Sequence, residues 1–342
     1  MVREQFMLRA LQLAELGRGN VSPNPMVGCV IVHEHRIIGE GYHQQFGGAH
    51  AEVNAIASVK DQSLLASSDV YVTLEPCSHY GKTPPCSDLL IEKQVRSVIV
   101  ATSDPNEKVN GQGIAKMQAA GIEVTIGVLE KASNQLNVRF NTFHQHKRPY
   151  VILKWAQTND GFIARKNFDS KWISNSYSRQ LVHKWRTEED AILVGYNTAF
   201  YDDPMLNARE WEGKDPLRVL LDRDLQLPTS HHLLDGSIPT MIMTRKAKES
   251  SGNQRYIQND MSPKSILEAL YQEGVSSVII EGGSRTIQDF INTGLWDEAR
   301  IFTSITEFPE GISAPKLDMN SSEVIDVDGD KLETFYHAKR QS

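Results

Sequence analysis

The feature that most constrains this chain is a set of one histidine and two cysteines early in the sequence: His50, Cys77 and Cys86. A catalytic zinc ion is held by three protein ligands of this kind and keeps its fourth position open for water. Two other interpretations exist: a structural zinc site, for which His79 could supply the fourth ligand, and unrelated core cysteines. The residues that flank the three ligands favour the catalytic site.

Two flanking residues indicate the chemistry of this predicted zinc site. Glu52 follows His50 by two positions, and Pro76 directly precedes Cys77. His-x-Glu followed by Pro-Cys is the signature of zinc-dependent nucleobase deaminases, in which the glutamate is a general acid and base and not a zinc ligand. Zinc lowers the pKa of the water that it binds. We therefore predict that Glu52 carries protons between that water and a departing amine.

The loop between the two cysteines is long. Eight residues separate Cys77 from Cys86, where cytidine and tRNA deaminases have two. Extra loop length beside an active site commonly binds substrate. His79, Lys82 and Thr83 offer hydrogen-bond donors suited to an anionic or polar ligand. The alternative is that the glycine and prolines of this loop make a rigid turn whose polar side chains only face water.

Length and charge limit the other possibilities. A chain of 342 residues predicts two domains, and the polar, proline-ended segment 144–149 places the boundary so that they span residues 1–146 and 147–342. A net charge of −7 argues against a nucleic-acid partner. No apolar run reaches about 18 residues, so no membrane span is expected. The charged N-terminus is not a signal peptide, and three cysteines give no disulfide framework, which predicts a cytoplasmic location.

Apolar runs alternate with amphipathic stretches in both halves, which predicts two α/β domains with helices packed on sheets. In the first half we expect strands at 27–32, 70–74, 98–101 and 123–128, and helices at 51–60, 86–93 and 111–120. In the second half we expect strands at 150–154, 191–195, 217–222, 240–244, 277–280 and 300–303, and helices at 176–186, 263–273 and 286–292.

The first half resembles the deaminase half of the bifunctional riboflavin-biosynthesis deaminase–reductases. The motifs HAEVNA (50–55) and PCSHYGKTPPC (76–86) carry the resemblance, with support from 23–28, 41–43 and 104–113. It implies a cytidine-deaminase-like three-layer α/β/α domain. It also implies a pyrimidine and phosphoribosyl pocket lined by Asn24, His43, His79, Lys82, Thr83, Asp104 and Asn106. Cys29 lies in an apolar run and is expected to be a core cysteine.

The second half resembles the reductase half of the same family. The motifs are KWA (154–156), DG (160–161), WIS (172–174), GYNT (195–198), DDPML (202–206) and EGG (281–283). The resemblance implies a dihydrofolate-reductase-like α/β domain that uses NADPH. The implied cofactor contacts are Ala156, Trp172, Thr198, Asp202, Gly283, Ser284, Arg285 and Thr286. The implied substrate contacts are Ser170, Arg186, Leu206, Arg209 and Glu281. The two arginines suit a ribose phosphate, because a guanidinium group binds phosphate through two parallel hydrogen bonds.

The resemblance implies a bifunctional enzyme with a small-molecule substrate, expected to be a homo-oligomer (dimer or tetramer). The first half would deaminate 2,5-diamino-6-(5-phosphoribosylamino)pyrimidin-4(3H)-one by hydrolysis, and the second would reduce the ribosyl group to ribityl with NADPH. One alternative is a nucleic-acid-editing or free-nucleoside deaminase with an appended domain; the editing enzyme would have a short cysteine spacing and a basic face. Another is a non-catalytic, zinc-stabilised pyrimidine nucleotide binding module, which would have no need of Glu52.

Overall fold

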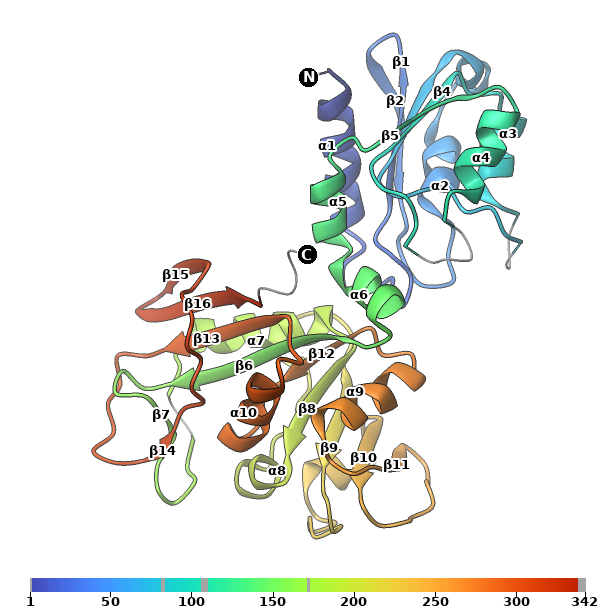
Figure 1. Cartoon of the computed structure of the whole chain (residues 1–342). Helices are drawn as coiled ribbons and strands as arrows, with labels where there is room; N and C mark the ends of the chain where they lie inside the picture. The colour runs from blue at the N-terminus through green and yellow to red at the C-terminus, as the bar shows by residue number, and fades with distance from the viewer. Residues whose placement is uncertain (1, 81–83, 106–109, 171–172, 338–342) are drawn as a thin grey trace. The chain divides into compact units, whose positions relative to one another are not determined.

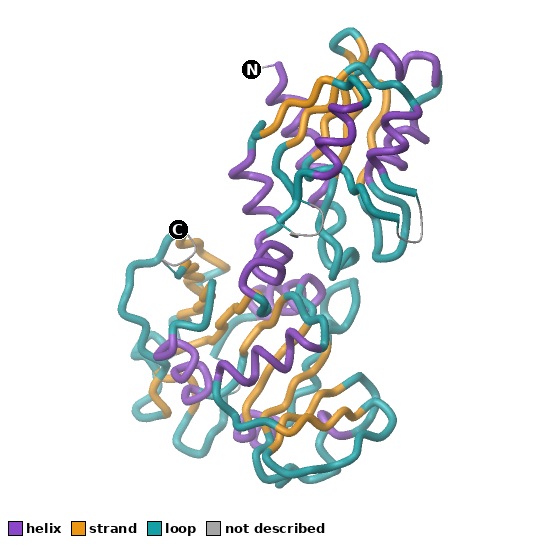
Figure 2. Tube along the Cα trace, turned by 45° about the vertical axis from the view of Figure 1, so that its right-hand side comes forward, coloured by secondary structure: helices purple, strands orange, loops and turns teal. Residues whose placement is uncertain are grey.

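The protein forms two compact units in this computed structural model, which describes residues 2–80, 84–105, 110–170 and 173–337. The first unit is Met1–Lys147 and the second is Arg148–Ser342 (Figure 1). Among the described residues, no helix combines the length and apolar character needed to span a membrane. Each unit is an α/β structure with its own sheet and its own buried core, with helices packed beside the strands (Figure 2).

The first unit has a mixed five-stranded sheet in the order β2-β1-β3-β4-β5. The strands are β1 (Gly28–His33), β2 (Arg36–Tyr42), β3 (Asp69–Val72), β4 (Ser97–Val100) and β5 (Glu123–Ile126). β1 pairs antiparallel with β2 and β3, whereas β3, β4 and β5 run parallel. The central strands are buried on both faces, which explains why their sequences are continuous apolar runs.

Helices cover both faces of this sheet and give the three-layer arrangement. They are α1 (Val2–Glu15), α2 (Ala51–Ser58), α3 (Cys86–Glu92), α4 (Gln112–Ala119), α5 (Glu130–Leu136) and α6 (Val138–His146), with a short 3-10 turn at Gln62–Ser67. α1 packs through Met7 and Ala10 on one face, and α2, α3 and α4 pack on the other. Cys29 packs on the side of the sheet that α2, α3 and α4 cover. It is fully buried, as expected for a core cysteine.

The second unit contains a nine-stranded sheet in the order β11-β10-β9-β8-β12-β6-β13-β16-β15. The strands are β6 (Tyr150–Gln157), β8 (Ala191–Gly195), β9 (Leu217–Leu221), β10 (Thr240–Thr244), β11 (Gln254–Gln258), β12 (Ser277–Ile280), β13 (Glu298–Thr303), β15 (Glu323–Val327) and β16 (Asp330–Tyr336). All neighbours from β11 to β13 are parallel, and β16 and β15 complete the sheet as an antiparallel hairpin. A separate two-stranded sheet joins β7 (Phe162–Ala164) to β14 (Ile312–Ser313).

Four helices pack against the two faces of the larger sheet. They are α7 (Ser176–Glu188), α8 (Tyr196–Asp202), α9 (Pro263–Gln272) and α10 (Ser284–Thr293), and a 3-10 turn lies at His232–Leu234. Leu270 of α9 and Phe290 of α10 are buried against strand side chains on one face of the sheet. Helix α8 packs against strand side chains on the other face. Parallel strands flanked by helices in this way leave a crevice at the carboxyl ends of the strands, where ligands bind in open α/β sheets.

The close packing of α1 on β1 can be tested at Gly28. A Cβ atom at this position would lie 2.0 Å from the carbonyl oxygen of Ala10 and 2.8 Å from the amide nitrogen of Ala14. Gly28→Ala should therefore push α1 away from the sheet and destabilise the first unit, by roughly 1–3 kcal/mol or more for overpacking of a core. Hydrogen–deuterium exchange should become faster in β1 and β3.

The second unit provides the internal control for this substitution. All five tryptophans lie after residue 148, so tryptophan fluorescence reports only on that unit. Its urea midpoint should match that of the wild type. If exchange protection in β1 is the same in Gly28→Ala as in the wild type, α1 does not pack against β1 as closely as described.

Candidate functional site

The three predicted zinc ligands meet in the first unit. His50 immediately precedes α2, Cys77 follows β3, and Cys86 is the first residue of α3. The Nδ1 atom of His50 lies 3.2 Å from the sulfur of Cys86 and 3.5 Å from the sulfur of Cys77. Tetrahedral zinc with usual bond lengths separates a nitrogen and a sulfur ligand by about 3.5 Å. The three side chains therefore fit a zinc ion bound through Nδ1 of the histidine.

The thiol groups of Cys77 and Cys86 differ in acidity. Cys77 accepts hydrogen bonds from Cys86, including one of 3.2 Å from the Cys86 backbone N–H, and it also contacts His50. These interactions outweigh burial and lower the pKa of Cys77 to about 4, whereas the hydrogen bond to Cys77 and burial raise the pKa of Cys86. A thiolate is the form of cysteine that binds metal, so Cys77 is prepared to receive a cation, and Cys86 would release its proton when the metal binds.

His79 does not complete a four-ligand structural site. Within the described ranges, the one group of side chains close enough to hold a metal ion comprises His50, Cys77 and Cys86. His79 is exposed in the loop that follows Cys77. Three ligands with no fourth protein ligand are typical of a catalytic zinc site.

Glu52 lies in the first turn of α2 beside these ligands. Its side chain is buried, with 3% of the residue exposed. Burial and the charge of Cys77 raise the pKa of Glu52 to about 6. A carboxyl group with a pKa near neutrality can both accept and release protons at physiological pH, as a general acid–base catalyst must.

Two of the predicted pocket residues form a chain of hydrogen bonds that ends beside the metal ligands. The Nδ1–H group of His43 donates to the carbonyl of Ala49 over 3.0 Å, which leaves its Nε2 atom as an acceptor. Asn24 donates to that Nε2 atom over 3.0 Å. The His43 ring lies edge-on to the ring of His50, with centroids 5.7 Å apart. Asn24 and His43 are thus held next to the zinc ligands.

Sequence reasoning missed Glu75, which holds the loop that carries Asp104. This buried carboxylate accepts hydrogen bonds from the backbone N–H groups of Asp104, Gly111 and Gly113 at 2.9–3.2 Å. An acidic residue at the end of an apolar strand was the available signal. Three other predicted pocket residues, Lys82, Thr83 and Asn106, lie outside the described residues.

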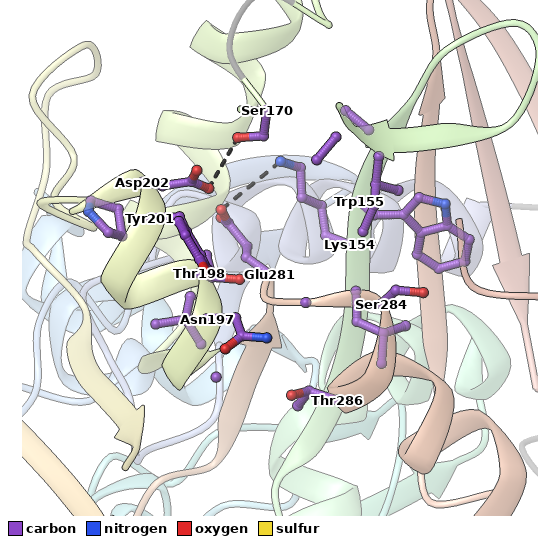
Figure 3. A pocket seen from close by; sticks show the side chains of 18 of the residues that line it. Lys154, Trp155, Ser170, Asn197, Thr198, Tyr201, Asp202, Glu281, Ser284 and Thr286 are labelled. Atoms are coloured by element: carbon purple, nitrogen blue, oxygen red, sulfur yellow. Dashed lines mark hydrogen bonds and ion pairs between the residues drawn. The ribbon is translucent and has the colours of Figure 1, made fainter. Parts of the chain in front are cut away.

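The second unit contains a cavity of about 1150 Å³ at the carboxyl ends of β6, β8 and β12. Seven of the predicted cofactor contacts line it: Ala156, Thr198, Asp202, Gly283, Ser284, Arg285 and Thr286. All five predicted substrate contacts line it too: Ser170, Arg186, Leu206, Arg209 and Glu281. Trp172 is outside the described residues. Segments far apart in the sequence therefore converge on one cavity, part of which is drawn in Figure 3.

A glycine pair shapes one wall of this cavity at the start of α10. A Cβ atom at Gly282 would lie 2.7 Å from the Cα atom of Val194, so only glycine lets the chain pass so close to β8. Gly283 has a φ angle of +60°, which glycine adopts without strain. The first residues of the ten-residue helix α10 line the cavity here, and the free backbone N–H groups at a helix start are suited to phosphate. This wall fits the pyrophosphate of a dinucleotide cofactor.

Three charged side chains form the polar centre of the same cavity. Arg186 donates two hydrogen bonds to Glu281 at 2.9 and 3.2 Å, and Lys154 lies 3.9 Å from the same carboxylate. Burial alone would raise the pKa of Glu281, but the charges of Arg186 and Lys154 outweigh it and lower that pKa to about 2. Burial lowers the pKa of Lys154 despite the nearby carboxylate. Figure 3 shows Lys154 and Glu281 pointing toward each other.

Lys154 was not among the predicted contacts, although it lies in a motif that was recognised. The available signal was a lysine inside an otherwise apolar strand, β6. Ser170, which also lines the cavity, donates to Asp202 over 3.0 Å (Figure 3). Arg209 is exposed at the edge of the cavity, where it donates to Asn207 over 3.0 Å.

Comparisons with known proteins cover both units. The zinc-binding region of cytidine and deoxycytidylate deaminases matches residues 1–102, and the RibD C-terminal domain matches residues 149–304. The riboflavin biosynthesis protein RibD of Aquifex aeolicus is 40% identical over 334 residues, which cover 94% of this chain and 93% of that protein. RibD of Bacillus amyloliquefaciens is 39% identical and covers 88% of this chain and 84% of its own length.

Solved structures of similar proteins have the same fold over nearly the whole chain. A diaminohydroxyphosphoribosylaminopyrimidine deaminase/5-amino-6-(5-phosphoribosylamino)uracil reductase from Thermotoga maritima matches with a TM-score of 0.91 and 38% identity, covering 98% of this chain and 99% of that one. Acinetobacter baumannii RibD matches with a TM-score of 0.91 and 34% identity, covering 98% of each chain. This chain therefore belongs to the RibD family of bifunctional deaminase–reductases of riboflavin biosynthesis.

Proposed function

We propose that the first unit removes an amino group from the diaminopyrimidine ring and that the second unit then reduces the ribosyl group to ribityl. The observation that carries this proposal is the set of three zinc ligands with Glu52 beside them. The cofactors are zinc for the deaminase and NADPH for the reductase. Family matches in both units favour this reaction pair over a nucleic-acid-editing deaminase and over a non-catalytic binding module.

In the deaminase, the residues of the chain divide the work of a hydrolysis. Zinc held by His50, Cys77 and Cys86 supplies Lewis-acid activation of water. Glu52, with its pKa raised to about 6, takes a proton from the attacking water and delivers it to the departing amine. His43 is fixed in one tautomer beside this centre and is placed to orient the pyrimidine ring.

In the reductase, the cavity binds cofactor and substrate side by side, and NADPH supplies the hydride. The start of α10 receives the cofactor phosphates, and Arg186 and Arg209 receive the substrate phosphate. Hydride addition at C1 of the ribosyl group opens the sugar ring and leaves an alkoxide that needs a proton. Lys154 lines this cavity, where burial lowers its pKa, and its ammonium form can provide that proton.

Location and assembly are the remaining parts of the proposal. A reducing, cytoplasmic compartment keeps Cys77 and Cys86 as free thiols that can bind metal. A homodimer or homotetramer is supported by the edge strand β15, where Val324 and Ile325 are exposed. Exposed apolar residues on an edge strand commonly mark a site of pairing with another chain.

The ligand assignment is tested by the metal content of cysteine variants. The wild-type chain should contain about one zinc per protomer, as expected for one three-ligand site. Cys77→Ser and Cys86→Ser should each lose most of this zinc because a hydroxyl group is a poor zinc ligand. Cys29→Ala is the matched control, since Cys29 is buried in β1 and is not one of the three clustered ligands, and it should keep full occupancy. Full zinc in either serine variant would refute the assignment.

The role of Glu52 is tested by Glu52→Gln, which keeps the size of the side chain and removes the proton-carrying group. Deamination should fall by about 10²–10⁴-fold, the usual contribution of general acid–base catalysis. Zinc content should be unchanged because Glu52 is not a ligand. NADPH oxidation with already deaminated substrate should also be unchanged, which shows that the second unit is folded, while the retained zinc reports on the first unit. Wild-type deamination by this variant would rule out the proposed proton transfer.

The phosphate contact in the reductase is tested by Arg209→Ala. The Michaelis constant for the deaminated substrate should rise about tenfold or more, because a hydrogen bond to a charged group contributes roughly 1.5–3 kcal/mol. Arg255→Ala is the control, since Arg255 is an exposed arginine paired with Glu273 and does not line the cavity. Steady-state kinetics should give a higher Michaelis constant for Arg209→Ala than for Arg255→Ala. Equal Michaelis constants would show that Arg209 does not contact the substrate.

A further inference from the structure

Asn137 makes an unusual pair of hydrogen bonds at the junction of α5 and α6. Its side chain is buried, with 2% of the residue exposed. The Oδ1 atom accepts a hydrogen bond from the backbone N–H of Met26 over 2.8 Å, and Nδ2 donates to the backbone carbonyl of Met26 over 2.9 Å. A side-chain amide offers one acceptor and two donors, so it can satisfy both backbone groups of a single residue. Asn137 therefore holds the main chain at Met26 at two points.

The backbone of Asn137 is fixed as firmly as its side chain. Its φ and ψ angles of −97° and 23° end α5 and begin α6. Its N–H group donates to the carbonyl of Ser133, and its carbonyl accepts from the N–H group of Asn141. The side chain is thus presented from a rigid corner, and Met26 packs against Leu136 from the same corner.

The segment that Asn137 holds leads directly to the deaminase centre. Met26 is two residues after Asn24, which donates to Nε2 of His43. His43 in turn donates to the carbonyl of Ala49, the residue before His50. A displacement of the chain at Met26 would therefore change the hydrogen bond that keeps the His43 ring in place.

The same corner also supports the segment that precedes Cys77. Ser133 of α5 is fully buried, and its hydroxyl donates to the carbonyl of Thr73 over 2.6 Å. Thr73 lies four residues before Cys77. The α5–α6 corner therefore fixes two separate backbone segments that lead to the site, although the deaminase family match ends at residue 102.

We propose that Asn137 is a positioning residue of the deaminase, which sets the orientation of His43 through Met26 and Asn24. The proposal rests on the deaminase function assigned to the first unit. It predicts that the region between the two family matches is required for substrate positioning and is not merely a connection to the second unit. Asn137 acts on the site through the backbone of Met26.

The test compares Asn137→Asp and Asn137→Ala with wild type in the full-length chain. Asn137→Asp keeps an acceptor for the Met26 N–H group and loses the donor to the Met26 carbonyl. Deaminase kcat/KM should fall about tenfold or more, mainly through KM, because small misplacements of positioning groups reduce rates strongly. Zinc content and reduction of deaminated substrate should be unchanged. Asn141→Ala is the matched control, because the side-chain amide of Asn141 donates to the backbone carbonyl and the side chain of Asn134, seven residues earlier in the chain.

A spectroscopic measurement separates positioning from general destabilisation. In wild type, ¹⁵N NMR of the histidine rings should show His43 as a single Nδ1–H tautomer, and Asn137→Asp should mix the two tautomers. If Asn137→Ala fails to fold, Asn137→Asp still decides the question. Wild-type kinetics together with an unchanged His43 signal would overturn the proposal. If the wild-type chain itself does not deaminate the substrate, the proposed function fails, and the NMR comparison still tests the link from Asn137 to His43.

Discussion

The chemistry of the first unit depends on the close approach of one imidazole nitrogen and two sulfur atoms, which together can hold a zinc ion. The end of β3 and the starts of α2 and α3 bring His50, Cys77 and Cys86 together from positions far apart in the sequence. The packing of α2 and α3 on one face of the sheet fixes those starting points. Glu52 lies in the first turn of α2, so the same packing places the proton carrier beside the metal ligands. Burial there gives Glu52 a pKa suited to its role.

The second unit has a different requirement, because two anionic molecules, the cofactor and the substrate, have to bind in one cavity. Glu281 is a buried negative charge in this cavity, and Arg186 and Lys154 balance it. Removing one member of such a group would leave an uncompensated buried charge, which usually costs several kcal/mol. The ion group therefore fixes the positions of α7, β6 and the end of β12 around the substrate side. The glycine turn before α10 forms the cofactor side.

The sequence predicted those features that depend on local patterns. Most strands and helices lie within a few residues of their expected positions, and the metal ligands were recognisable from their spacing. Glu75, Lys154 and Asn137 were not predicted as site residues, because each acts through contacts with segments distant in the sequence. The segment 144–149 was expected to be a linker, but α6 continues to His146, where His144 packs on Phe140 with ring centroids 4.4 Å apart. Short-range composition does not reveal such packing. Strands β2 and β15 were not predicted, because each has only two consecutive apolar residues and most of its side chains are partly or fully exposed.

One chain is expected to deaminate first and reduce second. Mass spectrometry of the pyrimidine product tests it most directly, with zinc-loaded protein incubated with the diaminopyrimidine substrate in the absence and presence of NADPH. Without NADPH, the product should show the mass change of replacing an NH group by oxygen and nothing more. With NADPH, two further hydrogens should appear on the same species. A product that has gained the two hydrogens while it keeps the amino group would contradict the order and the division of roles between the two units.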